Sequence, residues 1–421
     1  MENQVSKQLH SPVDMVSTFP LLRNYKFICL WIASLFSGIA FSAYLTTESW
    51  YVVNGLKMKW AVGVVMMVTA IPRVVFMMWG GVIADRFDRV RIMFLSSGAR
   101  CLLIVAMVYL LWAKGLPLLY LLLFAGVFGV LDAFFGPASQ SILPQIIKKE
   151  QLLKANSFME ITRNFGVILG PIFAGVILKW GSFIASFSVS GVALMIACLF
   201  LTGIQLHKDQ TTSSYREKKS TFQELKEGIH YVWATPWLRT LMLIALLTNL
   251  LLQGPLQGGI PLMVKYQLHG DALDLSFLEG SIAGGMIGGA LLIGWLNFRR
   301  RRMLISIILI MFLGVAIAIF SVIMETWQGM IVLAFGGVAI SMSNTIIITL
   351  FQERVDKEKI GRVMSLVVTA AMGFIPLSHG LVSLILSMGV SISAILFCSS
   401  TLMILYNGLM LMTARVIRET D

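Results

Sequence analysis

Charged side chains are scarce in this sequence. Asp, Glu, Lys and Arg make up 13% of the 421 residues, whereas about a quarter of a typical soluble domain is charged. Hydrophobic residues make up 57%, and the mean hydropathy is +0.83. Apolar runs such as 93–113 and 303–324 are long enough to cross roughly 30 Å of hydrocarbon. Because lipid offers the backbone no hydrogen-bond partner, such runs predict membrane-spanning helices and exclude an ordinary soluble domain.

Several chemical signatures are also missing. The four cysteines lie far apart in apolar runs, without CxxC or histidine-rich spacing, so we expect neither a disulfide framework nor a metal site. The five histidines are scattered along the chain and do not supply the converging groups of a membrane-embedded enzyme. The GxxxxGK(S/T) phosphate loop of an ATP-driven pump is absent too. We predict a protein that is not an enzyme and that needs no cofactor.

Twelve apolar runs predict an all-α membrane protein with two six-helix halves. The predicted spans are residues 27–53, 61–84, 93–113, 116–136, 161–180, 182–204, 237–261, 276–298, 303–324, 329–350, 363–386 and 390–414. The longest polar segment separates the sixth span from the seventh, and a capping-box pattern at Thr221–Glu224 predicts an interfacial helix within it. The expected organisation is a tail (1–26), an N-terminal bundle (27–204), a linker (205–236), a C-terminal bundle (237–414) and a second tail (415–421).

The basic residues are distributed unevenly between the two predicted sides of the membrane. Of the 33 Lys and Arg residues, 25 fall on one side, five on the other and three within spans. Loops rich in Lys and Arg stay in the cytoplasm, so we predict that both termini are cytoplasmic. The net charge of +12 then reflects topology, and we expect the lipid bilayer rather than nucleic acid as the partner.

Short sequence matches indicate an internal repeat. Gly80-Gly81 recurs as Gly288-Gly289, and Lys149-Glu150 recurs as Lys357-Glu358, both after the same interval of about half the chain. The matching dipeptides lie at equivalent positions relative to the predicted spans. Parallel repeats of six spans with a substrate site near the midplane between them are a transporter architecture.

The most specific motif lies between the second and third predicted spans. Gly81 permits close helix packing, and Asp85 stands where a carboxylate can accept hydrogen bonds from a helix N-terminus. Together with Arg86 and Arg89, this stretch resembles the signature loop of the major facilitator superfamily. The resemblance implies a cytoplasmic latch between Asp85 and the start of the eleventh helix, at Arg362. The alternative is that the arginines only fix the topology.

A second motif lies in the fifth predicted span. Gly166, Gly170 and Gly175 provide small residues for close helix packing, and Pro171 removes a backbone donor and can kink the helix. The stretch resembles the fifth-helix motif of exporters and antiporters in the same superfamily. Generic packing of transmembrane helices is the alternative.

Several ionisable residues fall inside predicted spans. Asp132 lies in the fourth span, where a charge is costly unless it is paired, and Arg73 and Arg100 are available partners. A structural ion pair and a role in proton transfer both remain open for Asp132. The superfamily's fourth-helix arginine, linked to proton coupling in other drug antiporters, is replaced here by Ala125.

Two further intramembrane carboxylates, Glu48 and Glu279, lie toward the predicted outer ends of their spans, where water is close. Either could bind substrate or take part in proton coupling.

Other short stretches resemble the branch of macrolide-efflux proteins and enterobactin exporters: Ile142–Gln145, Ala155–Ser157, Glu227–Tyr231 and Gly361–Val363. The resemblance implies a secondary transporter in the bacterial cell membrane, and we expect it to be monomeric. It would export a small drug- or antibiotic-like compound by proton antiport. The alternatives are a dedicated siderophore exporter and a solute importer. Aromatic and methionine side chains suit amphipathic ligands, whereas Arg73 and Arg100, if they face the cavity, would favour an anionic substrate.

Overall fold

The computed structural model describes residues 21, 23–148, 151–204, 230–296, 301–355 and 360–413. These ranges consist of helices and short connections and contain no strand. The first helices are α2 (Tyr25–Trp50) with the π-helical turn η1 (Tyr51–Gly55), α3 (Ala61–Arg86), α4 (Arg89–Lys114), α5 (Leu118–Ile146), α6 (Leu152–Lys179) and α7 (Phe183–Thr202). The next are α9 (Pro236–Gln253), the π-helical turn η3 (Gly254–Gly258), α10 (Gly259–Tyr266), α11 (Ala272–Leu296), α12 (Arg302–Phe320), α13 (Thr326–Arg354), α14 (Ile360–Ser387) and α15 (Ile392–Thr413).

Ten helical segments in the described ranges are long and apolar enough to cross a membrane. Two more helices, α3 and α14, contain the shorter apolar stretches Ala61–Met77 and Met372–Ser387. Two predicted boundaries were wrong: the fourth span was expected to end at 136 and the fifth to begin at 161, whereas α5 continues to Ile146 and α6 begins at Leu152. The apolar runs understate the length of both helices, which continue into sequence with more polar residues.

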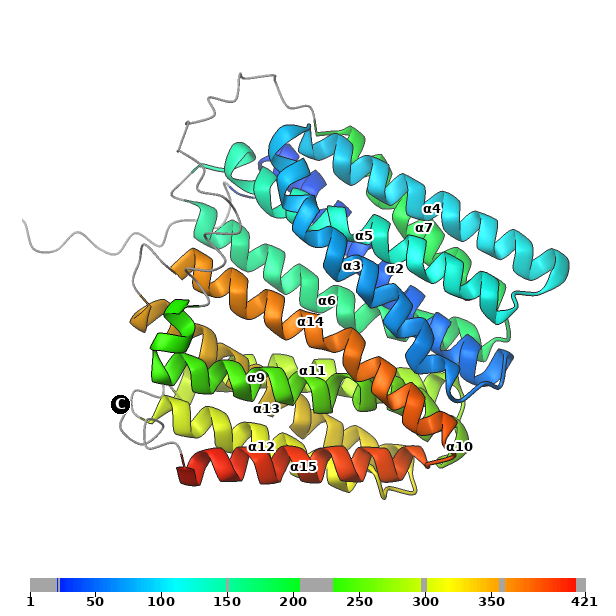
Figure 1. Ribbon diagram of the computed structural model, residues 1–421. Helices are drawn as coiled ribbons and strands as arrows, with labels where there is room; N and C mark the ends of the chain where they lie inside the picture. Colours follow the sequence, from blue (N-terminus) through cyan, green and yellow to red (C-terminus); the bar gives the residue numbers. More distant parts are fainter. Residues whose placement is uncertain are drawn as a thin grey trace, which may run out of the picture.

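The helices form two groups. Helices α2 to α7 pack against one another as an N-terminal half, and α9 to α15 as a C-terminal half, which lie one above the other in Figure 1. The most extensive contacts between the halves join α6 to α11 and α3 to α14. Most of the predicted tails (1–26 and 415–421) and of the linker (205–236) lies outside the described residues.

One end of the molecule holds close contacts between the halves. It includes the connections 56–60, 115–117, 180–182, 267–271, 321–325 and 388–391. Ser276 Oγ on α11 donates a hydrogen bond to the Pro171 carbonyl on α6 at 2.7 Å, and Ser383 on α14 donates one to the Trp60 carbonyl. We call this the contact end. The opposite end, which holds the ends of α3, α5, α11 and α13 and the starts of α4, α6, α12 and α14, is the basic end.

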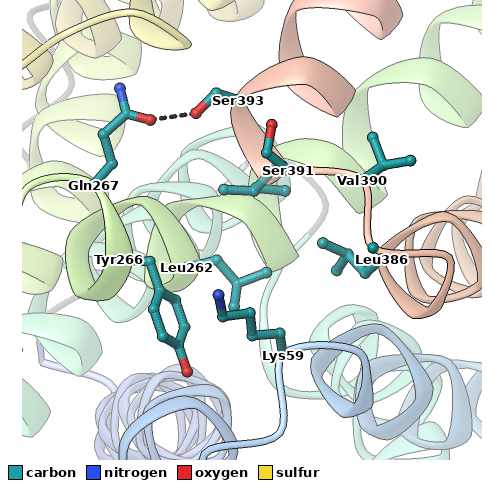
Figure 2. Close-up of a pocket in the computed structure, with 10 residues that line it drawn as sticks. Lys59, Leu262, Tyr266, Gln267, Leu386, Val390, Ser391 and Ser393 are labelled. Atoms are coloured by element: carbon teal, nitrogen blue, oxygen red, sulfur yellow. Dashed lines mark hydrogen bonds between the residues drawn. The ribbon is translucent and has the colours of Figure 1, made fainter.

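A pocket of about 530 Å³ lies at the contact end and is shown in Figure 2. Lys59 and Tyr266 line it, and the Lys59 ammonium group lies 3.9 Å from the Tyr266 ring centroid. Gln267 and Ser393, joined by a hydrogen bond, lie on its other side. Lys59 precedes α3 and Tyr266 ends α10, so this cation–π contact also links the two halves.

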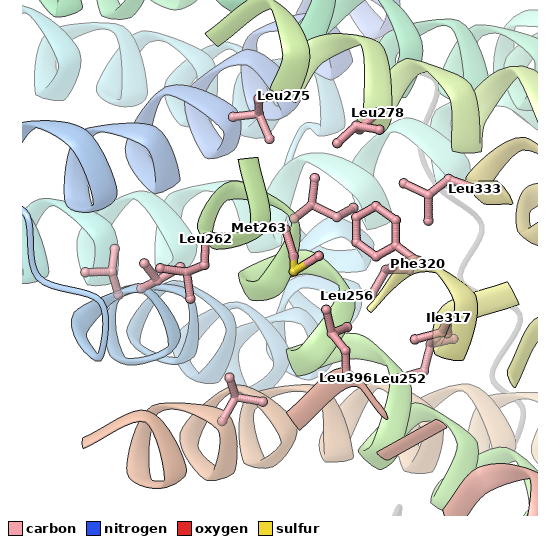
Figure 3. Packing of buried hydrophobic residues seen from close by; sticks show 14 of the residues in the cluster. Leu252, Leu256, Leu262, Met263, Leu275, Leu278, Ile317, Phe320, Leu333 and Leu396 are labelled. Carbon is pink, nitrogen blue, oxygen red and sulfur yellow. The ribbon is translucent and has the colours of Figure 1, made fainter. Parts of the chain in front are cut away.

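The continuous segment α9–η3–α10 runs through an apolar core. Leu252, Leu256 and Met263 are at most 8% exposed. Figure 3 shows them clustered with Phe320 on α12 and Leu396 on α15. Burial of these side chains determines how the segment is rotated about its axis. The rotation in turn determines on which face its polar residues lie.

Candidate functional site

Three helices of the N-terminal half meet at a group of charges, which we call the charge cluster (Arg73, Arg100 and Asp132). Asp132 on α5 pairs with Arg73 on α3 (Nε to Oδ2, 2.9 Å) and with Arg100 on α4 (Nη1 to Oδ1, 2.5 Å). Arg100 is fully buried and also donates a hydrogen bond to Ser37 on α2 at 3.0 Å. All three predicted residues are therefore brought together.

The charge cluster contains one cation more than anions. Within the described residues, Asp132 is the carboxylate that pairs with either arginine. Arg100 is 0% exposed, whereas Arg73 is 42% exposed. The Arg73 guanidinium lies 4.3 Å from the ring centroid of Phe41 on α2. The geometry therefore favours an ion-pairing role for Asp132, and of the two arginines only Arg73 is open to a ligand.

Two further carboxylates lie nearer the contact end. Glu48 on α2 is 1% exposed and accepts hydrogen bonds from Tyr44 at 2.8 Å and from Thr69 at 3.5 Å. Its position is more enclosed than the water-accessible one expected from the sequence. Glu279 on α11 accepts a hydrogen bond from Thr46 on α2 at 2.7 Å, which joins the two halves. Among the described residues, neither carboxylate forms an ion pair.

Sequence reasoning missed a row of carboxamides on the C-terminal half, which we call the amide ladder (Asn249, Gln253 and Gln257). Gln257 donates a hydrogen bond to Gln253 at 2.8 Å, and Gln253 donates one to Asn249 at 3.3 Å. Gln257 is exposed. The signal was present in the sequence, because amides four residues apart in an apolar run share one face of a helix.

The first two glycines of the fifth-helix motif pack within the N-terminal half. A Cβ added to Gly166 would lie 3.0 Å from the carbonyl carbon of Gly38 on α2, and one added to Gly170 would lie 2.5 Å from Ser42 Cβ. Both positions therefore let α6 and α2 approach more closely than larger residues would allow.

Gly175 of the same motif faces the C-terminal half instead. A Cβ at this position would lie 1.7 Å from Ser276 Oγ on α11. One turn earlier, the Pro171 carbonyl accepts the hydrogen bond from Ser276. The motif therefore shapes two contacts, one inside its own half and one between the halves.

The model of the Major Facilitator Superfamily matches residues 30–378, which is most of the chain. This chain belongs to the major facilitator superfamily. The resemblance predicted from the sequence motifs is confirmed, and the protein is a multi-pass bacterial membrane transporter.

Three relatives within the superfamily are named as exporters. The chain is 23% identical to macrolide efflux protein A of Streptococcus pyogenes, over 81% of this chain and 84% of the relative. It is 26% identical to the putative bacilysin exporter of Bacillus subtilis, over 62% of this chain and 64% of the relative. It is 24% identical to the enterobactin exporter of Citrobacter koseri, over 73% of this chain and 72% of the relative.

Solved structures share the fold at low sequence identity. A nucleoside transporter superposes with a TM-score of 0.71 at 13% identity, over 91% of this chain and 99% of that chain. A transporter of the POT family in complex with a thioalcohol-conjugated peptide gives a TM-score of 0.69 at 12% identity, over 93% of this chain and 96% of that chain. At these identities the likeness concerns the fold alone.

The superfamily's signature loop lies at the basic end. The structure describes the backbone of Gly81, Asp85, Arg86 and Arg362 but not the surroundings of these residues, so the latch between α3 and α14 stays a prediction. The neighbouring Arg89 donates a hydrogen bond to Ser141 on α5 at 3.1 Å.

Two more contacts organise the basic end. Asp88, where the superfamily usually has glycine, caps α4 by accepting hydrogen bonds from the backbone of Val90 and Arg91. In the C-terminal half, Arg302 on α12 contacts Glu353 on α13 at 2.5 Å. This hydrogen bond lowers the pKa of the Glu353 carboxyl below its usual value.

Proposed function

We propose that this protein exports a small organic compound from the bacterial cytoplasm and couples export to proton entry. Support for export comes from the three relatives named as exporters and from the fifth-helix motif. In transporters of this architecture, the halves rock about a central site, so that one end closes as the other opens. The hydrogen bonds between the halves described above lie toward the contact end. This conformation suits a compound that enters from the basic end.

The proposal assigns the basic end to the cytoplasm and counts twelve spans. The orientation follows from the distribution of Lys and Arg. The count of twelve includes α3 and α14, which have shorter apolar stretches but are helices of 26 and 28 residues. A cysteine at Gly270 should react with an impermeant thiol reagent added outside intact cells, and one at Ser213 should not. The opposite labelling pattern would reverse the orientation.

The observation that supports proton coupling is the hydrogen bond between Thr46 and Glu279, which crosses between the halves. An intramembrane carboxylate without a cationic partner is costly as an anion. In our proposal Glu279 binds a proton while the contact end is open, and the neutral group then allows the contact end to close. Release of the proton toward the basic end would return the carboxylate to its charged form and favour reopening. Glu48, close to Thr46 on α2 and also without an ion pair among the described residues, is the second candidate.

Glu279→Gln tests this coupling because glutamine keeps the hydrogen-bonding shape but cannot exchange the proton. Glu160→Gln is the matched control, because Glu160 is 61% exposed and, among the described residues, pairs with its neighbour Arg163 on the same helix. Both variants are expressed in a strain that lacks the gene, and their amounts in the membrane are compared. When the two variants are equally abundant in the membrane, we expect Glu160→Gln to restore the growth of the parental strain and Glu279→Gln not to restore it. Full complementation by Glu279→Gln would remove Glu279 from the mechanism.

The growth phenotype of that strain separates two substrate assignments. Sensitivity to several unrelated lipophilic antibiotics would support a drug exporter. Impaired growth only in low iron, with siderophore retained in the cells, would support a dedicated siderophore exporter, which the exposed guanidinium of Arg73 favours. A strain with neither phenotype would remove both assignments and leave the transporter fold unaffected.

A further inference from the structure

The exposed arginine of the charge cluster is not needed to neutralise Asp132. Arg100 already pairs with Asp132 and is completely buried. A second guanidinium in the middle of a span is costly unless it faces a polar space or a partner. Arg73 lies over Phe41 and remains 42% exposed. The ion pair with Asp132 is made through its Nε at 2.9 Å, so the terminal nitrogens can donate hydrogen bonds to a ligand.

Arg73 and the middle residue of the amide ladder, Gln253, lie at the same depth in the molecule. Arg73 is on α3, which begins at the contact end with Ala61. Gln253 is on the segment α9–η3–α10, which ends there at Tyr266, and Phe41 is on the segment α2–η1, which ends there at Gly55. At a helical rise of about 1.5 Å per residue, their positions along these segments place all three roughly 18–21 Å from the contact end.

The internal repeat relates Phe41 to the amide ladder. Gly170 on α6 packs against Ser42 on α2, and Ser378 on α14 packs in the same way against Gly254. Ser378 follows Gly170 by the same interval that separates the matching dipeptides of the repeat. By this packing Ser42 corresponds to Gly254, four residues beyond the interval of the dipeptides, and the preceding residues, Phe41 and Gln253, correspond to each other. In parallel repeats related by an axis along the membrane normal, equivalent positions on these helices face each other across the axis.

The amide ladder itself indicates a polar space. An exposed carboxamide facing hydrocarbon would leave its donors and acceptor unpaired, at a cost of roughly 2–7 kcal/mol. Gln257 is exposed, and the next residue, Gly258, approaches Val62 of α3 in the other half. The ladder therefore lies beside the region where the halves meet, not on the lipid-facing surface.

We propose that Phe41 and Arg73 on one wall, and Gln253 and Gln257 on the other, form a substrate site for a planar aromatic organic anion. The Arg73 guanidinium donates to the carboxylate or phenolate of the ligand, and its exposed face and Phe41 stack on the aromatic part. The amides bind neutral hydroxyl or carbonyl groups. The excess positive charge of the cluster disfavours cationic compounds. This inference rests on the proposed function for the transport route, but binding tests it without transport.

Two xanthene dyes of similar size test the charge preference. Carboxyfluorescein is an aromatic anion and rhodamine 123 an aromatic cation. Binding of each to the purified full-length protein in phosphatidylcholine nanodiscs is measured by fluorescence polarisation. We expect carboxyfluorescein to bind at least about ten-fold more tightly than rhodamine 123, because a charge-assisted hydrogen bond supplies an advantage of this order.

Three variants locate the site. Arg73→Gln should weaken carboxyfluorescein binding about ten-fold or more, and Gln253→Leu should weaken it by a smaller factor. Arg91→Gln is the matched control, because this arginine is 82% exposed at the basic end, and it should bind as the wild type does. If Arg73→Gln does not fold, Arg73→Lys keeps the charge without the planar fork and should show weaker binding with the anion preference retained.

The outcomes distinguish a failure of the proposed site from a failure of the proposed export function. Equal binding of the two dyes by the wild type, or unchanged carboxyfluorescein binding by folded Arg73→Gln, would overturn the site. The expected binding pattern without transport of carboxyfluorescein into inside-out vesicles would support the site and contradict export of this class of compound.

Discussion

The N-terminal half joins α4 to α5 through the ion pair of Arg100 with Asp132, whereas the C-terminal half joins the corresponding helices α12 and α13 through the hydroxyls of Ser306 and Ser343, 2.9 Å apart. The two walls of the proposed substrate site differ in the same way. Arg73 gives the N-terminal half an exposed cation, and the amide ladder gives the C-terminal half neutral hydrogen-bonding groups.

Backbone packing, by contrast, is nearly the same in the two halves. Gly129 on α5 and Gly337 on α13 are equivalent positions of the repeat, and a Cβ on either would lie 2.1 Å from a carbonyl oxygen, of Thr69 and Ile282 respectively. The repeat therefore preserves the close approach of helices and leaves the polar content of each half free to differ. The proposed substrate site is therefore asymmetric, although helices pack similarly in the two halves.

The largest effect is expected when the charged half is disrupted. Asp132→Asn leaves the buried Arg100 without its counter-charge, and breaking a buried ion pair in this way costs about 3–5 kcal/mol. Ser343→Ala, in the corresponding helix pair, removes the two buried hydrogen bonds between the Ser343 hydroxyl and Ser306 and should cost only about 1–2 kcal/mol. The yield of monodisperse protein and its unfolding temperature in detergent measure both. Normal folding of Asp132→Asn with loss of uphill export would instead identify Asp132 as a proton carrier.

The contact between the halves is expected to respond to Gly175→Ala. The added methyl group would overlap Ser276 Oγ on α11, so the contact end should open. A shift of about 1–3 kcal/mol would change the two populations by roughly 5- to 150-fold. A cysteine at Val62, buried in this conformation, should then react faster with an impermeant maleimide. Gly136→Ala is the control, since a Cβ at Gly136 meets nothing within 4 Å, and equal reactivity in both variants would contradict the account.

The cation–π contacts at the contact end should have a smaller effect. Lys59 lies over Tyr266, and Lys265 lies 6.0 Å from the Trp50 ring centroid, so each pair joins one half to the other. At exposed sites such contacts contribute about 0.5–1 kcal/mol. Lys59→Met should therefore raise the reactivity of the Val62 cysteine by only a few-fold. An increase as large as that of Gly175→Ala would show that charge, not close packing, holds this end together.

The smallest effect is expected at the basic end of the C-terminal half. Arg302 lowers the pKa of Glu353, so the contact stabilises the fold at neutral pH, and the stabilisation is lost as the pH falls below the usual range of glutamate, about 4.3. The Glu353 side chain is 52% exposed, so solvent screening limits the contribution to under about 1 kcal/mol. The difference in unfolding temperature between the wild type and Glu353→Gln should shrink from pH 7 to pH 4. A difference in unfolding temperature that grows from pH 7 to pH 4 would show that Glu353 is not charged in the folded protein at neutral pH.

Much of the fold could be predicted from the sequence because its strongest signals are local. Runs of apolar residues located the helices, and matched dipeptides at a constant interval indicated the repeat. The partners of Asp132 were also identifiable, because a charge within a span requires a counter-charge and few are available. The sequence did not indicate that Arg100 would be buried and Arg73 exposed, since this depends on how α3 and α4 turn against α5.

Contacts between the halves were the least predictable part. Thr46 and Glu279 are 233 residues apart, and their hydrogen bond depends on the relative position of two bundles. The burial of Glu48 follows from how the helices pack together, which hydropathy does not describe. The amide ladder was missed for a different reason: each amide is neutral, so a search for charges inside spans passes over it.

The most direct test of export compares small molecules inside and outside the cells of a strain that lacks the gene and of the same strain with the gene restored. We expect at least one organic compound to accumulate in the deletion cells and to be depleted from their medium, with both changes reversed when the gene is restored. A compound depleted from the deletion cells and left in their medium would contradict export and indicate an importer.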